Sequence, residues 1–182
     1  MTEVVAMRRL FSLVFCVLSL LASSQLMAAA GLDPLSHFFH ETFGDFAEEL
    51  EQAREEDKQG ILLFYEMDDC PFCQFMKENV LNQPEVQDFY REHFRNFMVD
   101  IEGDIEIQDF SGQEIKQKDF AKLARVRATP VIAFYDLTGK EIFRHTGRTS
   151  GVDEFLLMGK FIVDGAYKEQ KFIVYKREHL KR

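Results

Sequence analysis

The sequence predicts an α/β domain with a central mixed β-sheet flanked by helices, an extra N-terminal helix and a small hairpin insertion. The first observation is that 182 residues, 46% hydrophobic and 29% charged, fit one soluble domain of average size. The second is the order of the patterns, which run strand, helix, strand, helix, strand hairpin, helix. This order gives a βαβ unit followed by a ββα unit in one sheet. No internal repeat or low-complexity tract interrupts it.

Residues 1–30 have the pattern of a secretory signal peptide. Arg8 and Arg9 precede an apolar run from Leu10 to Leu21, and residues 28–30 are three alanines, the small-x-small form of a cleavage site. The apolar run is shorter than the ~20 residues of a membrane-spanning helix. We therefore expect export to the periplasm with cleavage before Gly31. An uncleaved membrane anchor is the alternative, and it would be the only association with a membrane.

The net charge argues against one class of partner, and the cysteine content points to one pair of residues. The net charge is −9 at pH 7, the opposite of the basic surface that nucleic-acid binding requires, so we expect no nucleic-acid partner. Removal of the signal peptide would also remove Cys16. Cys70 and Cys73 would then be the only cysteines, in a compartment where disulfides persist.

Residues 31–60 form the predicted N-terminal helical extension. Phe46, Leu50 and Ala53 recur at helical spacing, which predicts an amphipathic helix over about 45–57 that ends before Gly60. The apolar run 61–66 is then typical of a buried strand.

The predicted core, residues 61–166, continues from that strand. A helix should begin at the cysteines, with Pro71 in its first turn, and Pro84 should open the next helix. Residues 97–101 predict a second strand, and 105–112 predict the inserted hairpin.

The second half of the core has four further predicted elements. A helix over 118–125 should bury Phe120, Leu123 and Ala124, and strands at 131–135 and 141–144 should form an antiparallel hairpin. Ser150-x-x-Asp153 predicts the cap of a last helix ending near residue 165. Residues 167–182 form a C-terminal extension rich in Lys and Arg whose structure the sequence does not define, and its charged tail, 176–182, is expected to be a solvated end.

The pair in Cys70-Pro71-Phe72-Cys73 stands where a buried strand passes into a helix. The first sulfur then lies beside free backbone N–H groups and the positive end of the helix dipole, and both favour thiolate. One helical turn brings the second sulfur close enough to attack a mixed disulfide formed by the first. This spacing therefore predicts a redox-active dithiol.

Other uses of the two cysteines fit less well. An inert disulfide over so short a loop would restrict the unfolded chain little. Haem attachment requires histidine after the second cysteine, and residue 74 is Gln. A zinc site needs more ligands, and no histidine has ligand spacing to the pair. We expect neither a metal nor an organic cofactor.

With this dithiol and with Ala128-Thr129-Pro130 immediately before a strand, the chain resembles the thioredoxin-like superfamily. The resemblance implies that Thr129-Pro130 is the cis-proline loop, that Pro130 faces the cysteines, and that the Thr129 backbone pairs with an extended substrate segment.

A narrower set of motifs is similar to exported thioredoxins of the SoxW type, which are associated with bacterial sulfur oxidation or periplasmic thiol reduction. These motifs are Phe64-Tyr65-Glu66, Asp69 to Cys73, Met76, Val80-Leu81, Pro84-Glu85-Val86, residues 100–104 and Gly165-Ala166-Tyr167.

The sequence also departs from ordinary thioredoxin. Phe64 stands where the family's buried aspartate is expected, so proton transfer to Cys73 needs another group. Glu66, two residues further on the same strand face, is the candidate, although a carboxylate at a strand end is as often merely solvated. Phe72 is either a partly exposed substrate contact, which we favour, or the start of a core stripe. Asp68 and Asp69 are either solvated loop residues or tune the thiol, in which case a nearby carboxylate would disfavour thiolate about as much as the helix dipole favours it.

We therefore expect a monomeric, exported thiol-disulfide oxidoreductase. Cys70 would attack a disulfide in a protein or small molecule, Cys73 would resolve the mixed disulfide, and a dithiol electron donor would reduce the enzyme again. The alternative is a non-catalytic binding or chaperone module with the same fold.

Overall fold

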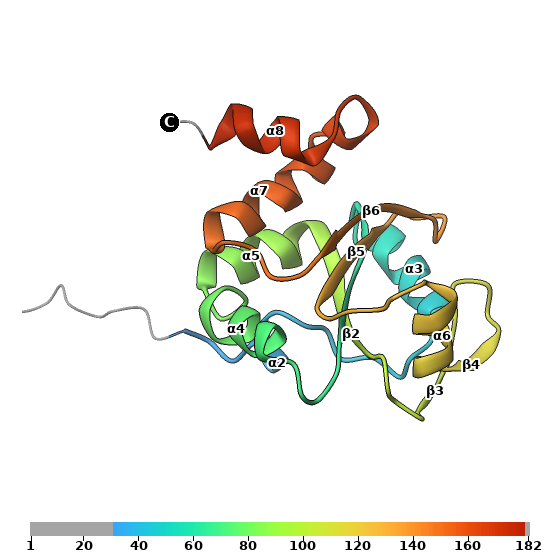
Figure 1. Cartoon of the computed structure of the whole chain (residues 1–182). Coiled ribbons are helices and arrows are strands. Elements are labelled where there is room, and N and C mark those ends of the chain that lie inside the picture. The colour runs from blue at the N-terminus through green and yellow to red at the C-terminus, as the bar shows by residue number, and fades with distance from the viewer. Residues whose placement is uncertain (1–30, 181–182) are drawn as a thin grey trace, which may run out of the picture. The chain divides into compact units, whose positions relative to one another are not determined.

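The computed structural model describes residues 31–180, and the elements within that range form three layers (Figure 1). The central layer is a four-stranded sheet in the order β2-β1-β5-β6. Its strands are β1 (Gly60–Glu66), β2 (Phe94–Asp100), β5 (Val131–Tyr135) and β6 (Glu141–Thr146). β1 pairs with β2 in parallel, whereas β5 is antiparallel to both β1 and β6. The sheet is mixed, as the sequence predicted.

Two helices, α4 (Pro71–Asn79) and α5 (Pro84–His93), make the crossover between the parallel strands β1 and β2. The first face of the sheet is covered by α4, α5, α7 (Val152–Val163) and α8 (Phe172–His179), with the 3-10 turn η1 (Ala166–Lys168) between the last two helices. Phe38 and Phe39, which follow the short helix α2 (Pro34–His37), pack into the same core. From β1, Leu62 and Phe64 face this side. Alternate residues of one strand therefore belong to opposite cores, as the period of a strand requires.

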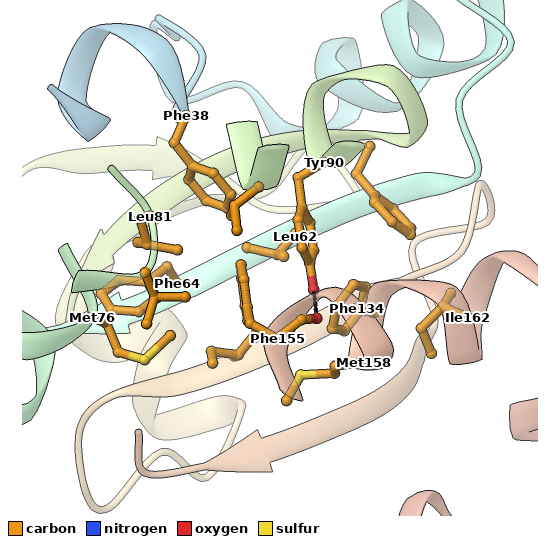
Figure 2. Close-up of a cluster of buried hydrophobic side chains, with 14 of the residues drawn as sticks. Phe38, Leu62, Phe64, Met76, Leu81, Tyr90, Phe134, Phe155, Met158 and Ile162 are labelled. Atoms are coloured by element: carbon orange, nitrogen blue, oxygen red, sulfur yellow. Dashed lines mark hydrogen bonds between the residues drawn. The ribbon is translucent and has the colours of Figure 1, made fainter. Parts of the chain in front are cut away.

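Aromatic packing holds this first face together, as Figure 2 shows. Tyr90 on α5 stacks on Phe155 of α7 with ring centroids 4.2 Å apart, and its hydroxyl donates a 2.6 Å hydrogen bond to the Phe155 carbonyl. Gly159 permits this close approach, because a Cβ there would lie 2.4 Å from a ring carbon of Phe89. A glycine in the middle of a helix, which costs about 0.5–1 kcal/mol relative to alanine, is thus explained by packing.

The opposite face carries α3 (Phe46–Glu55), α6 (Gln117–Leu123) and a two-stranded hairpin of β3 (Glu106–Gln108) and β4 (Glu114–Lys116). Asp45 caps α3 by accepting the Glu48 N–H at 2.9 Å. The hairpin lies between β2 and α6, where the sequence predicted an insertion.

Two details of the helices differ from the sequence-based expectations. Leu123 is 72% exposed, and Ala121 is buried beside Phe120 in its place. Asp153 does not cap α7. Instead Glu154 accepts hydrogen bonds from the Ser150 N–H and hydroxyl, at 2.8 and 2.5 Å.

The C-terminal segment contains a docked helix, α8, and the residues that follow Lys176 are exposed as far as Leu180. Lys176 of α8 forms a 2.6 Å ion pair with Glu154 of α7, and the Tyr175 hydroxyl donates to Asp164 at 2.9 Å. Tyr175 is buried in the first core.

The expected signal peptide, its cleavage site and Cys16 lie outside the described residues. Between residues 31 and 180, no helix is long and apolar enough to cross a membrane.

Candidate functional site

The two cysteines lie at the end of the sheet where β1 passes into α4. Cys70 is the N-cap of α4, and its Sγ accepts the Cys73 N–H at 3.0 Å. Pro71 occupies the first helical position, where its missing N–H leaves no hydrogen bond unmade. The sulfur of Cys70 is thus placed at the positive end of the helix, an environment that stabilises a thiolate.

Cys70 and Cys73 form a disulfide, with sulfurs 1.99 Å and Cα atoms 5.2 Å apart. Their side chains differ in accessibility, because Cys70 is 8% exposed and Cys73 only 1%. A surface depression of about 280 Å³ opens onto Cys70 and is lined also by Asp68, Asp69, Pro71 and Gln74. Cys70 is therefore the sulfur that an incoming disulfide can reach.

The loop before β5 lies at the same end of the sheet. Tyr65 of β1 pairs with Val131 of β5, so the next position of each strand places Pro130 opposite Glu66, just ahead of the cysteines. The Thr129–Pro130 peptide bond is cis. Within residues 31–180, neither the N–H nor the carbonyl of Thr129 has a backbone hydrogen-bond partner. The Thr129 backbone is thus free to pair with another chain.

Phe64 and Glu66 lie on the face of β1 that carries α4. Phe64 is fully buried in the first core, which also contains Cys73. Glu66 forms a 2.7 Å ion pair with Lys77, which follows Cys73 by four residues on α4. Residues four apart share one helix face, so Lys77 begins one turn after Cys73 on the same face of α4.

Phe72 is 53% exposed and adjoins a loop that the sequence analysis did not single out. This loop, residues 147–151, connects β6 to α7, and the guanidinium of its Arg148 lies over the rings of Phe72 and Phe75. No periodic pattern marks such a residue. Only its position between a strand and a helix could have drawn attention to it.

The arrangement can exchange disulfides: it offers one reachable sulfur, one buried sulfur a helical turn away, and an unpaired backbone segment nearby. Among the described residues, no three His, Cys, Asp or Glu side chains are placed to hold a metal ion.

A dithiol at a helix N-terminus, beside a cis-proline loop on a mixed sheet, defines the class of thioredoxin-fold proteins. The family model described as a thioredoxin-like domain matches residues 46–161, and the chain belongs to that family. Its match begins at the first residue of α3.

Solved structures agree with this assignment. A thioredoxin-fold protein from Helicobacter pylori is 26% identical, with a TM-score of 0.56, over 67% of this chain and 84% of that one. A proposed disulphide isomerase from Bacteroides thetaiotaomicron is 25% identical, with a TM-score of 0.55, over 75% and 96% of the two chains. A DsbH oxidoreductase, 22% identical over 81% and 92% with a TM-score of 0.51, supports the fold alone. None of the curated proteins matches the sequence.

Proposed function

We propose that this protein is an exported thiol-disulfide oxidoreductase that reduces disulfides in proteins or small molecules. The observation that carries the proposal is the contrast between the two sulfurs: Cys70 caps α4 and opens onto a surface depression, whereas Cys73 is buried one turn away. A structural disulfide has no need of this asymmetry, but a two-step exchange requires one accessible sulfur and one protected sulfur.

In the reducing direction the Cys70 thiolate attacks a substrate disulfide, forms a mixed disulfide and releases the first substrate thiolate. Cys73 then attacks Cys70 Sγ, which releases the second thiolate and leaves the Cys70–Cys73 disulfide. An external dithiol donor reduces the enzyme again. Thr129 and Pro130 would align an extended substrate segment, and Phe72 would contact it. The protein would act as a monomer.

Export and the closer kinship to SoxW-type thioredoxins are parts of the same proposal. Both rest on sequence patterns, namely the signal-like residues 1–30 and the motifs around the dithiol. The mass of the mature N-terminus in an exported fraction tests cleavage before Gly31. A mature protein that still carries residues 1–30 would contradict it.

The decisive experiment is reduction of insulin by the protein with dithiothreitol as donor. We expect catalysis by the wild type and its loss in Cys70→Ser, because that change removes the reachable nucleophile. In Cys73→Ala, mixed disulfides with substrates should accumulate on a non-reducing gel because the resolving sulfur is missing. Insulin reduction unaffected by Cys70→Ser would defeat the proposal and favour the non-catalytic binding module.

A further inference from the structure

The loop 147–151 is fixed to the structure on both sides of Arg148. The Gly147 N–H donates to the Pro130 carbonyl at 2.8 Å, which ties the loop to the cis-proline segment. Thr149 is fully buried, and its N–H and hydroxyl lie 3.4 and 3.5 Å from the Sδ of Met76 on α4. The backbone of Arg148 is therefore held between the two elements that border the dithiol.

The side chain of Arg148 lies over two aromatic rings, and its positive charge has no ion-pair partner within residues 31–180. Its guanidinium carbon lies 4.4 Å from the ring centre of Phe75 and 5.8 Å from that of Phe72. Arg148 is exposed and takes part in none of the ion pairs formed within residues 31–180. Arg148 also forms no side-chain hydrogen bond within residues 31–180, so its guanidinium N–H donors are available, and their fork matches a carboxylate.

Charges of opposite sign lie on two sides of the dithiol. Pro71 and Gln74 are three residues apart on one side of α4 and line the depression together with Asp68 and Asp69. Phe72 and Phe75 form the neighbouring side of the same helix, where Arg148 rests. A substrate cysteine that reaches Cys70 thus meets carboxylates in the depression, and an unpaired cation stands over the neighbouring side of α4.

We propose that Arg148 is a specificity-determining residue that selects disulfide-bearing peptide segments with an acidic residue next to the reactive cysteine. The inference rests on the proposed oxidoreductase function and concerns its substrate class. The substrate carboxylate pairs with the Arg148 guanidinium, while Asp68 and Asp69 repel an acidic residue on the other flank. The charge pattern therefore sets the direction in which an acidic segment lies across the dithiol.

The test uses three synthetic peptides, each with one cysteine joined by a disulfide to 2-thiopyridine. The residue before the cysteine is Glu in the first peptide, the residue after it is Glu in the second, and both positions are Gln in the third. The Cys70 thiolate of the pre-reduced enzyme attacks the peptide sulfur, forms the Cys70–peptide disulfide and releases 2-thiopyridone, whose absorbance reports the rate. Cys73 then displaces the peptide thiol and closes the Cys70–Cys73 disulfide.

One of the two Glu peptides should react about two- to five-fold faster than the Gln peptide at low ionic strength, the range of an exposed ion pair. High salt should reduce this preference. The ratio of the rate with the preferred Glu peptide to the rate with the Gln peptide should fall to about one in Arg148→Gln. It should stay partly raised in Arg148→Lys and fall below one in Arg148→Glu. Arg177→Gln, which removes an exposed arginine from α8, is the control for net charge and should leave the ratio unchanged.

The outcomes separate the inference from the function on which it rests. Equal rates for all three peptides with the wild type, or an unchanged ratio in Arg148→Gln, would overturn the role of Arg148 and leave the oxidoreductase in place. If no peptide releases 2-thiopyridone faster with the wild type than with Cys70→Ser, the proposed function itself fails. Circular dichroism of each variant confirms that the ratios compare folded proteins.

Discussion

Phe64 and Glu66 lie on the face of β1 that carries α4, the helix of Cys73. Phe64 is fully buried and has no group that could accept a proton. Glu66 is the carboxylate on that face of β1, and it pairs with Lys77, which follows Cys73 by one turn on α4. We therefore propose that Glu66 accepts the Cys73 proton in the resolving step, directly or through a water molecule.

Glu66→Gln should slow decay of the Cys70 mixed disulfide about ten-fold near pH 7 and leave its formation unchanged, because only the resolving sulfur needs the base. The difference should shrink toward pH 9, where an ordinary thiol ionises without help. Rapid-quench measurement of both steps against pH checks this. Glu78→Gln, on the exposed side of α4, is the matched control. Superimposable pH profiles for Glu66→Gln and the wild type would exclude the role.

Among the elements, α3 is attached to the sheet by a buried ionic cluster as well as by apolar packing. Arg95 of β2 donates to Glu49 of α3 at 2.7 and 2.9 Å, and both side chains are less than 10% exposed. A second bond at 2.7 Å joins Arg95 to Glu56, which is 43% exposed. Breaking a buried pair leaves an uncompensated charge, so this cluster makes the position of α3 sensitive to single substitutions.

Glu49→Gln should lower the free energy of unfolding by about 2–3 kcal/mol, less than the full cost of a broken buried pair because Glu56 remains beside Arg95. Urea unfolding monitored by circular dichroism measures the change. Glu51→Gln is the control on the same helix: its partner Arg54 is exposed, and its loss should cost under ~1 kcal/mol. Equal effects of the two substitutions would show that burial of the Arg95 cluster does not matter.

How far the sequence predicts the elements depends on whether their signals are local. Alternating or helical apolar spacing and the prolines at helix starts are local, and β1, α4, α5 and the β5–β6 hairpin follow the prediction. The docking of α8 depends on a partner 22 residues away, Glu154 for Lys176, and was not predictable. In α6, a seven-residue helix, too few apolar positions exist to define the buried face, so Leu123 was placed wrongly.

In the candidate site, too, the sequence predicts only those features that have a local signal. The helix start at Cys70 and the loop at Pro130 carry recognisable motifs, whereas the contact of Thr149 with Met76 joins residues 73 apart and leaves no trace in either segment. That contact holds the loop in which Arg148 lies over Phe72 and Phe75. The position of Arg148 could therefore be found only in the folded structure.

At the scale of the whole molecule, His40 links stability to pH. It lies in the segment that follows α2, where its N–H donates to the Asn96 carbonyl at 2.8 Å and its Nδ1 accepts the Asn96 N–H at 3.0 Å. Burial, with the nearby positive charges of Arg91 and Arg95, lowers the pKa of His40 from 6.5 to about 4. In the unfolded chain His40 binds a proton near pH 6.5, whereas in the folded chain it does so only near pH 4. The free energy of unfolding is therefore highest, as far as His40 is concerned, above pH 6.5, and it decreases as the pH falls toward 4.

Between pH 7 and pH 5 this linkage should remove about 1 kcal/mol of the free energy of unfolding, a figure reduced for the partial exposure of His40. Urea denaturation at the two pH values measures it. His40→Asn keeps a hydrogen-bond acceptor but cannot titrate, so its stability should change less over this interval. His37→Asn, at an exposed position on α2, should behave as the wild type does. A decrease of equal size in His40→Asn and the wild type would contradict the assignment.

The segment Gly31–Leu35 borders a second depression that shares Gln74 with the one beside Cys70. Its backbone is fastened there, since the Leu32 N–H donates to the Asn82 carbonyl at 2.9 Å and Gln87 donates to the Leu32 carbonyl at 2.9 Å. Immobilisation through residues 31–35 would consequently turn the reactive sulfur toward the support, whereas a tether attached at α8 would leave it open to the solution. Sensors or affinity resins built from this protein should be coupled at the carboxyl end.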